Sequence, residues 1–338
     1  MRTVVLALSV SVMSLVSLSG LRSEDPVETA DAAWDKGDYI AALSGYLEIL
    51  KSPGADAAFE HIALQTGELY STTELTTDGD APRFSPDGRH IVYSTGTGPA
   101  ATIRLSRTEA PGQVIATLPG YRGVFSPDGA RYAYLRITPT PALEQAFTAI
   151  DEGPAAGRAQ RLAAFNARLS IESALVVRDL TSGQEAALNT SGMRKQALAF
   201  TSAGVVLAGL PPEGTTGQLY LASEGADPAA LTSGDGEKVI GEVNAPGTAL
   251  TYTVRTGGGG RGGGARGGGA GGAGATFSVL TLPDRKTTTV RGAAPSFSAD
   301  GATLAYVTRE ANGNSLMVAP VTDVAAATAV RPSVGATP

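Results

Sequence analysis

The chain has 338 residues, of which 42% are hydrophobic and 17% charged, and it contains 43 glycines and 20 prolines. This composition fits a turn-rich β protein better than a helical bundle or a disordered tail. The net charge of −6 offers no long-range attraction to nucleic acid or anionic lipid, so neither is an expected partner. The absence of cysteine excludes disulfides and a cysteine-linked lipid.

Residues 1–20 have the features of a secretory signal peptide. Arg2 precedes an apolar run from Val4 to Leu18, and small residues that suit cleavage follow, ending at Gly20. The run is shorter than the ~20 residues that span a bilayer, which favours cleavage over the alternative of an uncleaved anchor. We therefore expect an exported protein, periplasmic or extracellular, with no membrane insertion after cleavage.

Residues 24–70 have apolar side chains at helical spacing and predict a short α-helical hairpin. The pattern Gly37-Asp38-Tyr39 followed by Ala42, Tyr46 and Pro53 resembles the second half of a tetratricopeptide repeat. A single helical repeat cannot bury its own apolar face. We expect it to pack against the rest of the chain, with a peptide-binding groove as the alternative. His61 in the third apolar stretch is interpreted as a packing or surface residue, not a ligand.

A five-residue motif of the type FSPDG recurs along the chain, each time followed by a short alternating strand that ends in tyrosine. In such a β-hairpin proline presets the turn, aspartate hydrogen-bonds the following backbone, and glycine supplies a positive φ, while the phenylalanine faces a shared core. We predict structural turn roles for Phe84, Pro86, Asp87, Gly88, Phe125, Pro127, Asp128, Gly129, Phe297, Asp300 and Gly301.

Two degenerate copies start at Phe200 and Val243, which makes five repeats. The starts are separated by 41, 75, 43 and 54 residues, while a four-stranded propeller blade takes ~40 to 50. We therefore predict a mainly β protein, with a β-propeller of about five four-stranded blades over residues 71–332. Residues 71–77 and 326–330 compete for the closing strand, which leaves open a five-bladed ring or the first five blades of a larger propeller.

Two insertions explain the long spacings. Residues 138–170 have a helical pattern, and residues 257–275 form a glycine-rich loop. Both are expected between the second and third strands of a blade, and so on one face, where long loops on a rigid scaffold concentrate binding residues. Deleting residues 138–170 is expected to abolish binding and leave the thermal midpoint nearly unchanged. The glycine-rich tract lacks the interleaved aromatics of RNA-binding tracts and is interpreted as a loop tip.

The FSPDG motif and the strand after it resemble the WD40-like repeat, of the PD40 type, found in TolB-family periplasmic proteins. The same repeat builds the N-terminal propellers of prolyl-oligopeptidase-type (S9) serine peptidases, and the resemblance covers residues 71 to about 330. In those peptidases the propeller restricts substrate access, and a separate α/β-hydrolase domain carries the catalytic serine, aspartate and histidine.

No catalytic, cofactor or metal residue is predicted in this chain. It has no GxSxG motif, and its two histidines are His61 and His90. There is no HExxH motif, and Asp87, Asp128 and Asp300 belong to separate turns, which argues against a shared calcium site. The leading hypothesis is an exported scaffold that binds a protein or peptide on the inserted-loop face. The alternatives are the substrate-gating propeller of an S9-type peptidase and a small-ligand protein that uses the central channel.

Overall fold

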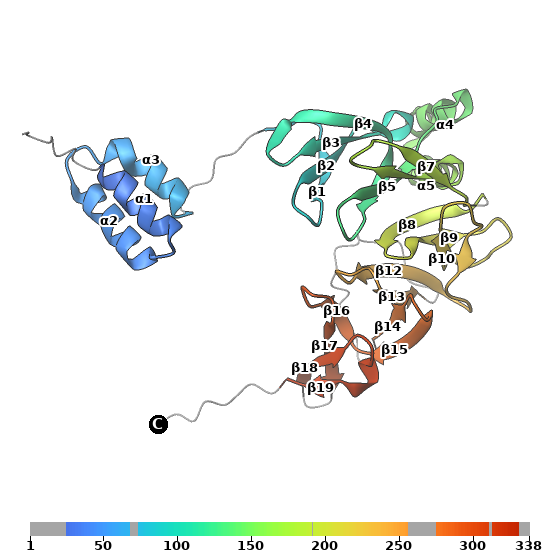
Figure 1. Ribbon diagram of the computed structural model, residues 1–338. Helices are drawn as coiled ribbons and strands as arrows, with labels where there is room; N and C mark the ends of the chain where they lie inside the picture. The colour runs from blue at the N-terminus through green and yellow to red at the C-terminus, as the bar shows by residue number, and fades with distance from the viewer. Residues whose placement is uncertain (1–24, 68–73, 191, 256–274, 311–312, 331–338) are drawn as a thin grey trace, which may run out of the picture. The chain divides into compact units, whose positions relative to one another are not determined.

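A computed structural model describes residues 25–67, 74–190, 192–255, 275–310 and 313–330 (Figure 1). The chain divides into two units, one up to Glu74 and one from Leu75 onward, and each is described by itself. The predicted signal peptide and residues 257–274 of the glycine-rich loop lie outside the described residues. No described helix has the length and apolar character needed to cross a bilayer.

The first unit contains three helices, α1 (Pro26–Asp35), α2 (Tyr39–Lys51) and α3 (Asp56–Gln65). The side chains of Asp25 and Asp38 accept hydrogen bonds from the first turns of α1 and α2 and so act as N-caps. Ala42 and Tyr46 of α2 are buried against α1 in a small core. The Tyr46 hydroxyl donates to Asp31 of α1 at 2.5 Å, and the His61 Nε2 of α3 lies 2.8 Å from the same carboxylate. His61 thus links α3 to α1.

The second unit begins with two blades that share one long strand. Both blades are antiparallel and follow the chain order. Blade 1 is formed by β1 (Asp80–Phe84), β2 (His90–Thr95), β3 (Thr102–Arg107) and the first part of β4 (Ala110–Phe125). Blade 2 is formed by the second part of β4 with β5 (Arg131–Arg136), β6 (Ala174–Asp179) and β7 (Glu185–Leu188). A 3-10 turn, η1 (Gly98–Ala100), connects β2 to β3.

Three further antiparallel sheets of four strands follow. Blade 3 contains β8 (Arg194–Thr201), β9 (Gly204–Leu210), β10 (Gln218–Ala222) and β11 (Ala229–Ala230). Blade 4 contains β12 (Glu237–Val243), β13 (Ala249–Arg255), β14 (Thr276–Thr281) and β15 (Lys286–Arg291). Blade 5 contains β16 (Ala293–Phe297), β17 (Thr303–Glu310), β18 (Gly313–Pro320) and β19 (Thr328–Ala329), after the 3-10 turn η3 (Val324–Ala326). The prediction of a mainly β propeller is confirmed.

Hydrophobic clusters lie between consecutive blades, because alternate residues of each strand point to opposite faces of the sheet. Between blades 1 and 2, for example, Ile103 and Leu105 of β3 pack with Tyr132 and Tyr134 of β5. The tyrosines that follow the motifs of blades 2, 4 and 5 therefore belong to these inter-blade cores. Burial of this apolar surface is the main source of cohesion between the blades.

The outer strand of blade 5 is β19, close to the C-terminal end of the described chain. Residues 74–77, the described part of the competing N-terminal segment, form no strand. No hydrogen-bonded strand pair joins β1 to β19 among the described residues. Phe84 at the end of β1 is 64% exposed, whereas the equivalent Phe200 of blade 3 is 4% exposed. The side of blade 1 that faces away from blade 2 thus leaves its motif phenylalanine uncovered.

Candidate binding sites

The motif residues form the turns between the first and second strands of their blades. In each of the three full motifs the serine hydroxyl donates to the aspartate at 2.5 Å, in Asp87, Asp128 and Asp300 alike. The same carboxylates accept backbone N–H groups two residues further on. These bonds to the ionised form, led by the serine hydroxyl, lower the pKa of all three carboxyl groups. Each carboxylate is thus engaged within its own turn.

The turns also contact one another from blade to blade. The Gly247 carbonyl in blade 4 accepts a hydrogen bond from the Ser202 backbone in blade 3, at 2.9 Å. The Asn244 amide in blade 4 donates to the Gly301 carbonyl in blade 5, at 3.0 Å. We call the side of the propeller that carries these turns the turn side. The opposite side, where second strands lead to third strands, is called the insertion side.

The helical insertion lies on the insertion side of blade 2, between β5 and β6. It contains α4 (Pro141–Glu152) and α5 (Arg158–Glu172), joined by the 3-10 turn η2 (Ala155–Gly157). In blade 4 the corresponding second and third strands are β13, which ends at Arg255, and β14, which begins at Thr276.

The two inserted helices have a core that is continuous with the propeller. Leu143, Ile150, Phe165 and Leu169 are at most 6% exposed, and Tyr121 of β4 packs against them. This burial argues against the expectation that residues 138–170 can be deleted with little change in thermal midpoint. The sequence shows a helical period but not which surface the helices cover.

Lys195 of β8 connects the C-terminal end of α5 to the propeller by a hydrogen bond. Its side chain is fully buried, and its Nζ donates to the carbonyls of Ile171, at 3.1 Å, and Met193, at 2.9 Å. The Ile171 carbonyl belongs to the last turn of α5, where carbonyls lack intrahelical donors and cations are favoured. Among the described residues no carboxylate forms an ion pair with Lys195, and burial lowers its pKa to about 8.

Lys195 makes stability depend on pH in a defined direction. Its pKa is about 8 in the folded chain and 10.5 in the unfolded chain. Between pH 8 and pH 10.5 the Lys195 amine is protonated in the unfolded chain and neutral in the folded chain. The free energy of unfolding therefore rises with pH, by at most about 1.4 kcal/mol per pH unit. We expect urea midpoints measured from pH 7 to 9.5 to rise for the wild type relative to Lys195→Met. Parallel curves for the two proteins would contradict this assignment.

Every innermost strand contains a bulge a few residues before its motif phenylalanine or the equivalent valine. The strand register shifts at this place in β1, β4, β8, β12 and β16. Three non-glycine residues at these bulges, Ala81, Arg122 and Ala294, have φ between 50° and 53°. Such conformations cost free energy and occur where the surrounding structure imposes them. No residue pattern in the sequence pointed to these bulges.

The innermost strands of blades 1 to 4 line a cavity of about 540 Å³, which we call the channel cavity. Most of its lining side chains are apolar and include Phe125, Phe200 and Ile240. Among the described residues Arg83 is the only charged one in the lining, and its side chain forms no ion pair with any of them. Apolar side chains with a few polar groups are common in ligand pockets.

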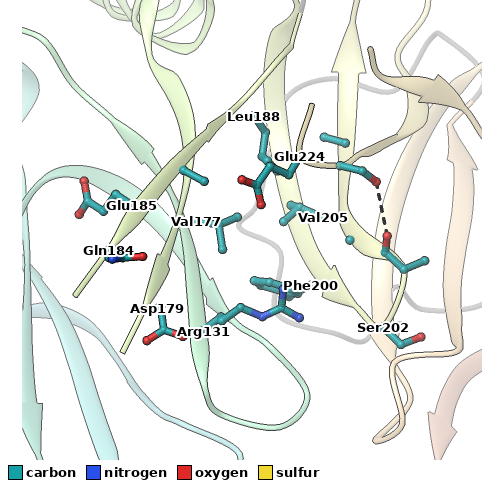
Figure 2. A pocket seen from close by; sticks show the side chains of 15 residues that line it. Arg131, Val177, Asp179, Gln184, Glu185, Leu188, Phe200, Ser202, Val205 and Glu224 are labelled. Atoms are coloured by element: carbon teal, nitrogen blue, oxygen red, sulfur yellow. Dashed lines mark hydrogen bonds between the residues drawn. The ribbon is translucent and has the colours of Figure 1, made fainter. Parts of the chain in front are cut away.

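A second cavity, of about 380 Å³, opens on the turn side between blades 2 and 3 (Figure 2). We call it the blade 2–3 cavity. Its charged lining residues are Arg131, Asp179, Glu185 and Glu224, and Val177, Leu188 and Val205 are among the apolar ones. The Arg131 guanidinium carbon lies 5.0 Å from the centre of the Phe200 ring, a cation–π contact. The motif position Phe200 was predicted, but its arginine partner was not.

The two histidines belong to different units of the chain. His61 lies in the helical unit, while His90 begins β2, and the buried His90 Nδ1 has no hydrogen-bond partner among the described residues. Among the described residues no group of three or more histidine, aspartate or glutamate side chains could hold a metal ion.

No protein-family model and no curated protein sequence matches the chain. Among solved structures the chain is similar to TolB from Acinetobacter baumannii, with 17% identity and a TM-score of 0.41. That match covers 72% of this chain and 52% of TolB, so the chain spans about half the length of that structure.

The chain is also similar to the β-propeller domain of the Trilobed protease from Pyrococcus furiosus, with 11% identity, a TM-score of 0.43 and coverage of 76% and 73%. A structure from a study of two prolyl endopeptidases matches with 14% identity and a TM-score of 0.45, over 89% of this chain and 41% of that one. The matching structures thus include a TolB protein and a prolyl endopeptidase, the two classes of protein whose repeats the FSPDG motif resembles.

Proposed function

We propose that this chain is an exported binding scaffold that holds a protein or peptide partner on the insertion side of its propeller. The observation that carries the proposal is the rigid attachment of α5. Buried Phe165 and Leu169 hold one face of the helix on the propeller, and Lys195 holds its last turn. The opposite face is therefore presented in a fixed position at little further entropic cost on binding.

The presented face of α5 is uncharged and carries small or apolar side chains together with one glutamine. Gln160, Ala164, Ala167 and Ile171 follow one another at intervals of three or four residues and so share one side of the helix. Ile171 is 46% exposed, and its carbonyl is bound by Lys195 of the innermost strand of blade 3. The end of the stripe therefore lies beside that innermost strand. An uncharged stripe that ends in an exposed isoleucine suits the apolar side of a helical or extended peptide.

The test uses peptides selected from a displayed random-peptide library on the purified chain. We expect Ile171→Arg to weaken binding of the selected peptides at least tenfold, because it places an unpaired charge in an apolar contact. Ile115→Arg is the matched control, since Ile115 on β4 is also an isoleucine that is 46% exposed. A library without saturable binders would contradict the binding function. Binders that are equally insensitive to both changes would contradict the surface.

A second candidate function, the substrate-gating propeller of an S9-type peptidase, is favoured by the channel cavity. Its position among four innermost strands suits the passage or retention of an extended peptide. An in-frame GxSxG with later aspartate and histidine encoded after Pro338 would support this candidate. For the chain alone we expect no hydrolysis of prolyl or aminoacyl test substrates, and turnover sensitive to serine-directed inhibitors would overturn that expectation.

A further inference from the structure

We propose that the blade 2–3 cavity binds a free peptide of two or three residues in its zwitterionic form. In this arrangement the peptide carboxylate contacts Arg131 and the peptide ammonium contacts Glu224. The cavity opens on the turn side, so the proposal goes beyond the binding surface on α5 and does not depend on it.

Arg131 supplies an anion site that is already oriented. Its guanidinium rests on the ring of Phe200, which is 4% exposed and held by the core between blades 2 and 3. The guanidinium has no hydrogen bond or ion pair with any described residue. An arginine fork of this kind binds a carboxylate through two parallel hydrogen bonds, and stacking on an aromatic ring reduces the entropy lost on binding.

Two of the three carboxylates in the lining are engaged within the protein. Asp179 Oδ1 accepts hydrogen bonds from the backbone N–H groups of Thr181 and Ser182 and from the Ser182 hydroxyl. These bonds, with a smaller effect from the charge of Arg131, lower the pKa of Asp179. Glu185 forms ion pairs with two arginines and accepts the Tyr134 hydroxyl.

The charged groups in the lining that form no hydrogen bond or ion pair with the described part of the chain are thus one cation and one anion. Glu224 follows β10, is exposed, and has no ion pair or hydrogen bond of its carboxylate with the described part of the chain. Figure 2 shows Arg131 reaching the cavity from blade 2 and Glu224 from blade 3, with Val177 and Val205 drawn between them. A ligand that satisfies both ends needs a carboxylate and an ammonium separated by an apolar part.

The size of the cavity selects a short ligand. Its volume of about 380 Å³ is at the lower end of the ~300–1,000 Å³ typical of small-molecule sites. A peptide of two or three small residues carries both charges at this scale. A segment inside a protein lacks the two terminal charges and would have to supply them from side chains, which makes the free peptide the better fit.

The test measures calorimetric binding of the tripeptide Ala-Val-Ala and of its two capped forms. Amidation removes the carboxylate charge, and acetylation removes the ammonium charge. For the wild type we expect each cap to weaken binding on the order of tenfold, as charge-assisted hydrogen bonds imply. In Arg131→Gln the effect of amidation should vanish while that of acetylation remains, and in Glu224→Gln the reverse should hold.

This crossed pattern cannot arise from misfolding, since a misfolded variant would lose both effects together. Arg89→Gln is the control for Arg131→Gln. Arg89 is an exposed arginine in the turn of blade 1, and its replacement removes one positive charge as Arg131→Gln does. That variant should bind all three peptides as the wild type does. The proposal is overturned if Ala-Val-Ala shows no saturable binding at millimolar concentration, or if the caps act equally on the wild type and both variants.

Discussion

Gly247→Ala is expected to lower the free energy of unfolding by about 3 kcal/mol. Gly247 has φ of +70°, a conformation that costs an alanine about 1 kcal/mol. A Cβ at this position would also stand 2.6 Å from Pro127 Cγ in blade 2 and 2.7 Å from the Ser202 backbone nitrogen in blade 3. Because the Ser202 contact is with backbone, neighbouring turns must move apart. Urea unfolding followed by circular dichroism measures the loss.

Gly88→Ala separates the two contributions. Gly88 occupies the same turn position in blade 1 with φ of +71°, but a Cβ there would meet no atom within 4 Å. We expect a loss of about 1 kcal/mol, from the backbone conformation alone. Equal losses in the two variants would show that contacts between turns contribute nothing to the cohesion of the blades.

Phe165→Ala in α5 is expected to cost about 4 kcal/mol, the usual penalty for emptying a buried phenylalanine site. Phe165 is 3% exposed and packs against Phe147 with the two rings tilted at 50° and their centres 5.1 Å apart. Because this core includes Tyr121 of the long strand shared by blades 1 and 2, the loss should appear in the unfolding of the propeller itself. Near-ultraviolet circular dichroism during urea titration measures it.

Leu162→Ala is the matched change on the same helix. Leu162 is 37% exposed, so its truncation should cost less than about 1 kcal/mol. If Phe165→Ala had as small an effect, the inserted helices would be an independent appendage. In that case the expectation drawn from the sequence, that residues 138–170 can be removed with little change in thermal midpoint, would be restored.

The propeller could be predicted from the sequence because its turns obey local rules. Proline, aspartate and glycine at fixed positions act within five residues, and the motif at Phe125 needs no knowledge of distant contacts. The degenerate copy at Phe200 can be recognised only from the spacing of the full motifs. Likewise, the interruption after the second strand of blade 2 follows from counting residues between motifs.

The parts that could not be predicted depend on contacts between blades. Lys195 in a β8 strand with polar neighbours gives no sign that it is buried under a helix end 24 residues earlier in the chain. Arg131 follows the turn of blade 2, and nothing near it in sequence indicates that its guanidinium rests on Phe200 of blade 3. Sequence reasoning placed binding on the insertion side, yet the blade 2–3 cavity is built where two such distant residues meet on the turn side.

The strand β4 has a mechanical consequence for the propeller. It runs from Ala110 to Phe125 as an outermost strand in blade 1 and an innermost strand in blade 2. At the crossing, the Pro119 carbonyl accepts from Ile137 while the Gly120 N–H donates to Ala101, so no free linker separates the two sheets. Blades 4 and 5 are likewise joined through the single residue Gly292, whose N–H donates to Ala275, whereas longer connections join blades 2 and 3 and blades 3 and 4. We therefore expect blades 1 and 2 to tilt together, and any separation of blades to begin at the junctions before and after blade 3.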